Sequence, residues 1–151
     1  MAESWPYMFR GVNPMPTALS TTYGPGHYAV DIPAPAWTPI ASVGKGIVKE
    51  TSDGMTQAQV NADQRGHFIT VELDDYKVNG KKVWIRCLHL AQAPGRNVGS
   101  AVAANHAIGY VGTTGSVSTG NHLHFDMNLQ KVPTQGDATN LNPCNYFSQL
   151  R

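Results

Sequence analysis

The chain has 151 residues, of which 41% are hydrophobic and 14% charged, a balance that predicts one globular domain and excludes disorder and a coiled coil. A net charge of +1 gives no electrostatic footprint for nucleic acid, and no apolar run approaches the roughly 20 residues of a membrane span. The 15 Gly and 10 Pro predict many turns and therefore β structure.

The first 22 residues are rich in Pro, Gly and Thr. They predict an extended N-terminal segment or linker, followed by one domain over residues 23–151. The N-terminus has neither the basic region nor the apolar region of a signal peptide. We therefore expect either export by another route or a domain excised from a larger protein.

An early histidine and aspartate have a spacing that suits metal ligands. In the run Gly26-His27-Tyr28-Ala29-Val30-Asp31-Ile32, a strand would place His27 and Asp31 on one face and the apolar residues on the other. A helix would also align the two, but Pro33 and Pro35 follow at once and disfavour it. Zinc accepts both side chains as ligands, although this pair alone is a weak signal.

The next part of the chain predicts short strands separated by loops. Residues 33–39 are expected to form a loop, and residues 40–43 and 46–50 predict two short strands around a Gly-Lys-Gly turn. Residues 51–66 are polar and predict a variable loop with a helical turn near residues 55–62.

A hairpin is predicted in the middle of the chain. His67–Leu73 and Val83–Leu90 alternate as strands do, and Asn79-Gly80 between them is typical of a type I′ turn. His89 therefore ends a strand, where it either faces solvent or contributes to a site. We expect His67 and His106 to be ordinary surface or turn histidines.

A second pair of histidines follows a loop rich in Gly, Ser and Thr. Residues 97–112 predict small strands, and residues 113–120 lack the Gly-x-x-x-x-Gly-Lys pattern of a nucleotide-binding loop. In a strand His122 and His124 project from one face, whereas in a helix they would diverge by roughly 200°. Two imidazoles side by side on a strand are half of a metal site, or else two partly exposed histidines near a sheet edge.

Residues 141–147 predict a turn and a short helix, and there is no long amphipathic helix or internal repeat. The expected architecture is mainly β, a single antiparallel domain with few short helices. Cys87 and Cys144 are the only cysteines, and without a Cys-x-x-Cys pattern they do not indicate a thiolate zinc site. We expect two free, buried thiols rather than a disulfide.

The ordered set His27-x-x-x-Asp31, His89 and His122-x-His124 resembles the M23 family of zinc metallopeptidases, the lysostaphin- and LytM-like peptidoglycan endopeptidases. The resemblance covers most of the chain, from about residue 23 to residue 147. Further matching elements are Thr38-Pro39-Ile40, Gly46-Ile47-Val48, Leu88-His89-Leu90, Gly112-x-Thr114-Gly115, Ser118-Thr119-Gly120-x-His122-Leu123-His124-Phe125 and Leu141-Asn142-Pro143.

The resemblance implies the LytM/lysostaphin fold and one zinc ion held by His27, Asp31 and His124, with water in the fourth position. His89 and His122 would then deprotonate or orient the zinc-bound water, stabilise the oxyanion and protonate the leaving amine. Zinc would lower the pKa of the water towards 7 and polarise the scissile carbonyl.

The implied reaction is hydrolysis of amide bonds in the peptide cross-links of bacterial peptidoglycan, either in a glycine-containing cross-bridge or in a stem peptide. A monomeric, secreted or wall-associated module of a larger lysin, bacteriocin or phage tail protein, with an antimicrobial role, would fit this reaction. Tyr23, four residues before His27, is a candidate for the tyrosine that some members aim at the oxyanion, although aromatic packing explains it equally well. The chain departs from the family at Arg86, at Asn121 and in a longer hairpin over residues 73–83, and these departures leave the bond preference open.

Three alternatives differ in class. The first is an M23-like domain that has lost its zinc and serves as a scaffold or activator, which the complete set of five site residues disfavours. A cupin-type metal protein also uses His-x-His, but after His124 the nearest carboxylate is Asp126, and the early His-x-x-x-Asp would be unexplained. A carbohydrate-binding module could use Trp5, Trp37 and Trp84, but nothing places them on one face, and core packing is the better interpretation.

Overall fold

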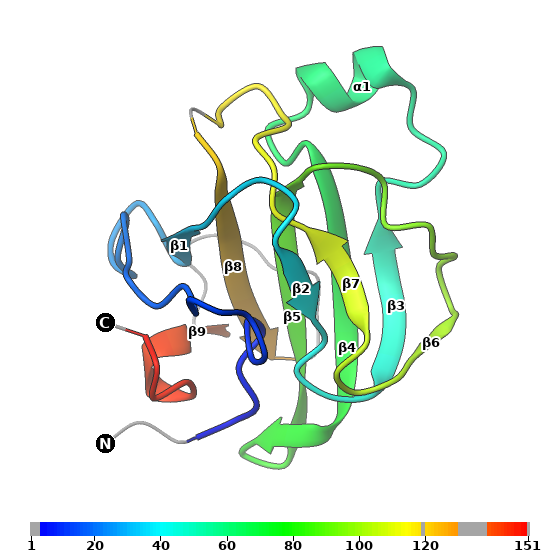
Figure 1. The fold of residues 1–151 in the computed structure, drawn as a ribbon. Helices are drawn as coiled ribbons and strands as arrows, with labels where there is room; N and C mark the ends of the chain where they lie inside the picture. Colours follow the sequence, from blue (N-terminus) through cyan, green and yellow to red (C-terminus); the bar gives the residue numbers. More distant parts are fainter. Residues whose placement is uncertain (1–3, 119, 130–138, 151) are drawn as a thin grey trace.

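The computed structural model describes residues 4–118, 120–129 and 139–150. Within them, seven strands form an antiparallel sheet in the order β1-β8-β5-β4-β3-β6, with β9 paired to β8, and β2 and β7 form a second sheet (Figure 1). The mainly antiparallel β architecture with few short helices is thus confirmed. The strands are β1 Val30–Pro33, β2 Pro39–Ala41, β3 Gly46–Thr51, β4 His67–Val78, β5 Lys81–Leu90, β6 Ala101–Val102, β7 Ala107–Tyr110, β8 His122–Leu129 and β9 Asn140–Leu141, with helix α1 at Gln57–Ala62 and a 3-10 turn at Pro143–Asn145.

The hydrophobic core lies between the large sheet and the elements packed on one of its faces. Along β5, Val83, Ile85 and Cys87 are buried in this core, whereas Trp84 and Arg86 alternate with them and remain partly exposed on the opposite face. The small sheet of β2 and β7 lies over the large sheet (Figure 1), and its residues Ile40 and Ile108 belong to the same core. The period of two therefore leaves the outer face of the large sheet available for polar side chains.

The described part of the N-terminal segment, residues 4–22, consists of turns and irregular chain, and it packs on the core. The side chains of Trp5, Tyr7 and Phe9 are buried, and the ring of Phe147 near the C-terminus packs against the rings of Trp5 and Tyr7. The Trp5 amide also donates a hydrogen bond to the carbonyl of Tyr146 at 2.9 Å. Residues 1–3 of the expected segment lie outside the described part of the chain.

The predicted hairpin is confirmed, and β4 extends beyond its predicted end. Asn79 and Gly80 have φ values of 52° and 73°, as a type I′ turn requires. Strands β2 and β3 do not pair with each other, although the sequence predicts two strands joined by the Gly-Lys-Gly turn. β2 pairs with β7 and β3 with β4 and β6, so the chain passes from one sheet to the other between residues 42 and 45.

Two further expectations need correction. The strand expected from Gly26 begins only at Val30, because His27 lies in a tight turn closed by reciprocal backbone hydrogen bonds with Gly24, both 2.9 Å. Trp37 does not pack in the core: 56% of its surface is exposed, although Trp5 is buried as expected. The interpretation of all three tryptophans as core residues is therefore wrong for Trp37, and also for Trp84, which lies partly exposed on the outer face of the large sheet.

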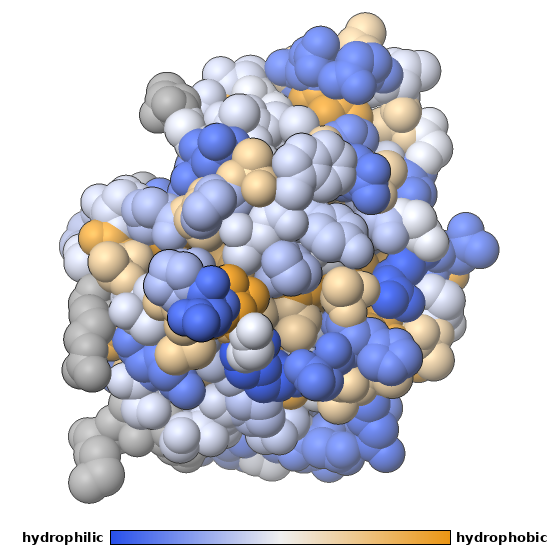
Figure 2. Space-filling view, in the orientation of Figure 1, coloured by the Kyte–Doolittle hydropathy of each residue, from blue (hydrophilic) through white to orange (hydrophobic). Residues whose placement is uncertain are grey.

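The cysteines and the surface complete the description. Cys87 and Cys144 are both free, as predicted, but only Cys87 is buried. Hydrophilic and hydrophobic residues are interspersed in small groups on the face shown in Figure 2. The described residues contain no helix that is long and apolar enough to cross a membrane.

Candidate active site

The pairing of β1 with β8 brings the early and late motifs together. Asp31 on β1 lies opposite His124 on β8 in the antiparallel register, and Pro33 lies opposite His122. His27 reaches the same place from the turn that precedes β1. The ligand atoms of His27, Asp31 and His124 all lie within 4.8 Å of one another, which makes these three residues a possible metal site.

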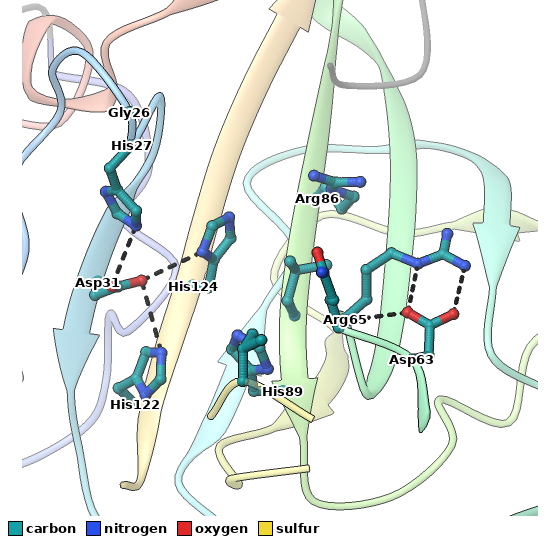
Figure 3. A pocket seen from close by; sticks show the side chains of 12 residues that line it. Gly26, His27, Asp31, Asp63, Arg65, Arg86, His89, His122 and His124 are labelled. Carbon is teal, nitrogen blue, oxygen red and sulfur yellow. Dashed lines mark hydrogen bonds and ion pairs between the residues drawn. The ribbon is translucent and has the colours of Figure 1, made fainter. Parts of the chain in front are cut away.

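The carboxylate of Asp31 is the centre of this cluster (Figure 3). Its Oδ2 lies 3.2 Å from His27 Nε2, and its Oδ1 lies 3.3 Å from His124 Nδ1 and 3.6 Å from His122 Nε2. Oδ1 is nevertheless buried without a hydrogen-bond partner among the described residues. A bound cation would satisfy a buried carboxylate oxygen that faces imidazole nitrogens in this way, so the donor set fits a divalent metal.

Backbone carbonyls fix the orientation of three of the imidazoles. The Nδ1 atoms of His27, His89 and His122 lie 3.3, 2.9 and 2.8 Å from the carbonyl oxygens of residues 22, 114 and 120. A carbonyl oxygen only accepts, so each Nδ1 carries the hydrogen. In the neutral ring the lone pair is then on Nε2, which faces away from the carbonyl.

His124 has the opposite orientation. Its Nε2 lies 2.9 Å from Oδ2 of Asp126, so Nε2 donates to that carboxylate and Nδ1 faces Asp31. Burial would lower the pKa of His124, but the hydrogen bond to Asp126 and the nearby Asp31 carboxylate outweigh it and raise the pKa to about 9. A metal that binds Nδ1 at neutral pH must therefore displace a proton.

His89 is held in an unusual backbone conformation at the end of β5. Its φ is 64°, in the left-handed region, and its amide donates to the carbonyl of Arg65 at 2.9 Å. The side chain is buried, and its ring centroid lies 5.0 Å from that of His122. Burial lowers the pKa of His89 to about 4, so its imidazole is neutral at pH 7.

The five residues line one cleft of about 820 Å³. On the opposite side of it lie Asp63, Arg65 and Arg86 (Figure 3). The loop that carries Asp63 and Arg65 packs tightly on the loop after β7, where a Cβ atom on Gly66 would lie 2.3 Å from the carbonyl oxygen of Thr114. The cleft rim therefore depends on close backbone contact between these two loops.

The structure brings His27, Asp31, His89, His122 and His124 together, as the sequence suggested. Tyr23 is not among the residues that line the cleft; its ring packs edge-on against Tyr28, with centroids 5.6 Å apart, and its role at the oxyanion stays a prediction. His67 and His106 do not line the cleft either, and His67 Nδ1 is hydrogen-bonded to the Ser52 hydroxyl at 3.0 Å.

The sequence reasoning missed the partner of His124. In the sequence, Asp126 is visible only as a carboxylate that does not suit a cupin, and Arg86 only as a departure from the family pattern. The spacing contained the signal, because residues 124 and 126 of one strand share a face. The Arg86 side chain could not be connected with Asp126 before the pairing of β5 with β8 was known.

The sequence model of peptidase family M23 matches residues 25–140 of the chain. Among solved structures, the catalytic domain of the antimicrobial peptidase lysostaphin from Staphylococcus simulans is 27% identical with a TM-score of 0.63, over 83% of this chain and 87% of that one. The full structure of lysostaphin from Staphylococcus simulans is 26% identical with a TM-score of 0.65, over 85% of this chain but 48% of that one, so the chain spans about half of lysostaphin.

A zinc-containing peptidase from Vibrio cholerae has a TM-score of 0.64 at 21% identity, over 89% of this chain and 39% of that one. This last match shows the fold alone. No curated protein sequence matches the chain significantly.

Proposed function

The chain belongs to peptidase family M23, and on that premise we propose that it is a zinc endopeptidase that hydrolyses amide bonds in the peptide part of bacterial peptidoglycan. Membership of the family makes it a metallopeptidase. The observation that carries the proposal is the convergence of His27, Asp31 and His124 on one point, with Asp31 Oδ1 buried and lacking a hydrogen bond within the described residues.

We propose that the metal ligands are His27 Nε2, the Asp31 carboxylate and His124 Nδ1. Two imidazoles and one carboxylate are a ligand set that zinc prefers, and three protein ligands leave a position open as in catalytic sites. When bound, zinc would polarise the scissile carbonyl and acidify water.

His122 and His89 are assigned the proton transfers. Because Nδ1 of each ring donates to a backbone carbonyl, each neutral ring keeps the Nε2 lone pair that a general base requires. His122 Nε2 lies 3.6 Å from Asp31 Oδ1, beside the proposed metal site. The pair would accept a proton from the attacking water, donate to the negative oxygen of the intermediate and return a proton to the leaving amine.

The substrate class is supported by the resemblance of this catalytic unit to lysostaphin, an antimicrobial peptidase. The chain spans about half of that protein, so we propose, by extension, that the domain acts at the cell wall, outside the cytoplasm, as a monomer and as part of a larger lysin or bacteriocin-type protein. The bond is in either a glycine-containing cross-bridge or a stem peptide.

The test is digestion of purified peptidoglycans of different cross-bridge types, with and without a chelator, followed by mass spectrometry of the fragments. We expect new amine termini that disappear on chelation and reappear when zinc is added back. The His122→Ala variant with zinc bound serves as the control for contaminating hydrolases. Absence of cleavage of every wall type by the zinc-loaded protein would overturn the proposal.

A further inference from the structure

We propose that Asp126, itself held by Arg86, is a positioning residue that fixes the His124 ring so that Nδ1 faces the metal. The inference rests on the proposed zinc site. It extends the site from three ligands to a chain of contacts, Arg86 to Asp126 to His124, that crosses two strands.

Asp126 is a fully buried carboxylate. It is 0% exposed, and its Oδ2 accepts from His124 Nε2 at 2.9 Å. Burying a carboxylate in this way is costly unless it is paired and hydrogen-bonded. Its position therefore requires partners, and the two that the structure gives are the ligand imidazole and the Arg86 guanidinium.

Arg86 binds the carboxylate side-on from the neighbouring strand. Its Nε lies 3.2 and 3.3 Å from the two oxygens of Asp126, and its Nη2 lies 2.8 Å from Oδ2. The β5–β8 register places Arg86 opposite Asp126, and His124 lies two residues before Asp126 on β8. Arg86, Asp126 and His124 therefore share the outer face of the sheet. This two-point contact prevents the carboxylate from rotating away from the imidazole.

The orientation of His124 is the property that this contact controls. A carboxylate only accepts, so Nε2 must carry the hydrogen and Nδ1 becomes the ligand atom. The other imidazoles of the site are bonded to backbone carbonyls through Nδ1, whereas only His124 among them presents Nδ1 to Asp31. Among the described contacts of His124, the hydrogen bond to Asp126 is the one that keeps the hydrogen on Nε2.

A purely structural role is the competing explanation, because a buried ion pair between neighbouring strands also affects stability. Two variants separate the roles. Asp126→Asn keeps the shape and removes the charge, and Arg86→Met with Asp126→Leu replaces the whole pair by apolar side chains, which is often neutral or stabilising. The matched control is Glu72→Gln, since Glu72 also accepts from a β5 side chain, Trp84 Nε1 at 2.8 Å, but does not touch the site.

Zinc affinity is measured by competition with a chromophoric chelator, and the binding nitrogen of His124 by ¹⁵N NMR of the imidazoles in the zinc-loaded protein. We expect His124 to bind through Nδ1 with a slowly exchanging Nε2–H. In both variants zinc affinity should fall roughly 10- to 100-fold, the range for ligand-orienting partners, and the slow Nε2–H should be lost in the double variant. Glu72→Gln should bind zinc as the unaltered protein does.

Zinc affinity equal to that of the unaltered protein in a folded variant would overturn the inference, as would coordination of His124 through Nε2. If Asp126→Asn fails to fold, the double variant decides. The two proposals fail differently. A protein that binds no zinc at all contradicts the proposed function, whereas zinc-dependent cleavage with unchanged affinity in the variants contradicts the role of Asp126 alone.

Discussion

His89 combines a proposed catalytic role with a left-handed backbone, and substitutions there should reveal the conformational cost. At φ 64° the backbone of a residue with a Cβ atom is strained by roughly 1–2 kcal/mol, whereas glycine adopts this conformation without that strain. Glycine loses more chain entropy on folding, about 0.5–1 kcal/mol relative to alanine. We therefore expect His89→Gly to be more stable than His89→Ala by about 0.5–1 kcal/mol, although both variants lose the same imidazole and the same bond to the carbonyl of Thr114.

His122 provides the matched control, because it lies in β8 with an ordinary strand backbone. There alanine should be more stable than glycine by about 0.5–1 kcal/mol. Comparing the glycine–alanine difference at the two positions cancels the entropy contribution and leaves the left-handed cost of roughly 1–2 kcal/mol.

The assay is urea unfolding of all four variants in the presence of a chelator, so that metal binding does not enter. Unchanged m-values are required, since they show that the same surface is exposed on unfolding. The same order at both positions, with alanine more stable than glycine, would refute the reasoning that His89 is conformationally strained.

Other predictions concern the metal, the cleft rim and the thiols. His124→Ala should abolish zinc binding, whereas His122→Ala should bind zinc but lose nearly all activity. Equilibrium dialysis measures the bound zinc, and an activity assay measures cleavage. Loss of zinc in His122→Ala and its retention in His124→Ala would exchange the assigned roles. Zinc at 1,000 times its dissociation constant should stabilise the fold by about 4.1 kcal/mol, so a chelator should lower Tm by roughly 10 °C, measured by calorimetry. Gly66→Ala should cost roughly 2–4 kcal/mol in urea unfolding, because φ is +65° and the added Cβ meets the Thr114 carbonyl; a cost below about 1 kcal/mol would show that the loops separate freely. In the native protein an alkylating reagent should label Cys144 but not Cys87, because the Cys87 thiol is buried whereas Cys144 is partly exposed; mass spectrometry of labelled peptides would detect the contrary result.

Much of the fold followed from local patterns. Asn79-Gly80 specifies its own turn, and the alternation of residues 83–90 predicted a strand there, because both effects act between residues close in sequence. The assignment of residues 40–43 and 46–50 to one pair of strands failed for a different reason. Gly46 must approach the Glu72 carbonyl so closely that a Cβ would lie 2.1 Å from it, and that contact with a distant strand directs β3 into the large sheet.

The candidate site shows the same division. Spacing and residue type indicated His27, Asp31 and the His122-x-His124 pair, even though the strand expected around His27 proved to be a turn. Sequence alone could not show that Arg86 faces Asp126, because that contact depends on the register of two strands 40 positions apart in the chain. Nor could it place Trp37 on the surface, since aromatic residues favour the core on average.

The N-terminal segment has a practical consequence for anyone who wishes to graft this domain onto another protein. The family match begins at residue 25, but the carbonyl that orients His27 belongs to Thr22, and residues 20 and 21 exchange backbone hydrogen bonds with Asp31. Further back, Trp5 and Phe9 fill part of the common core. A fusion cut at the start of the family match would therefore remove supports of two proposed ligands, and a usable junction lies before Trp5.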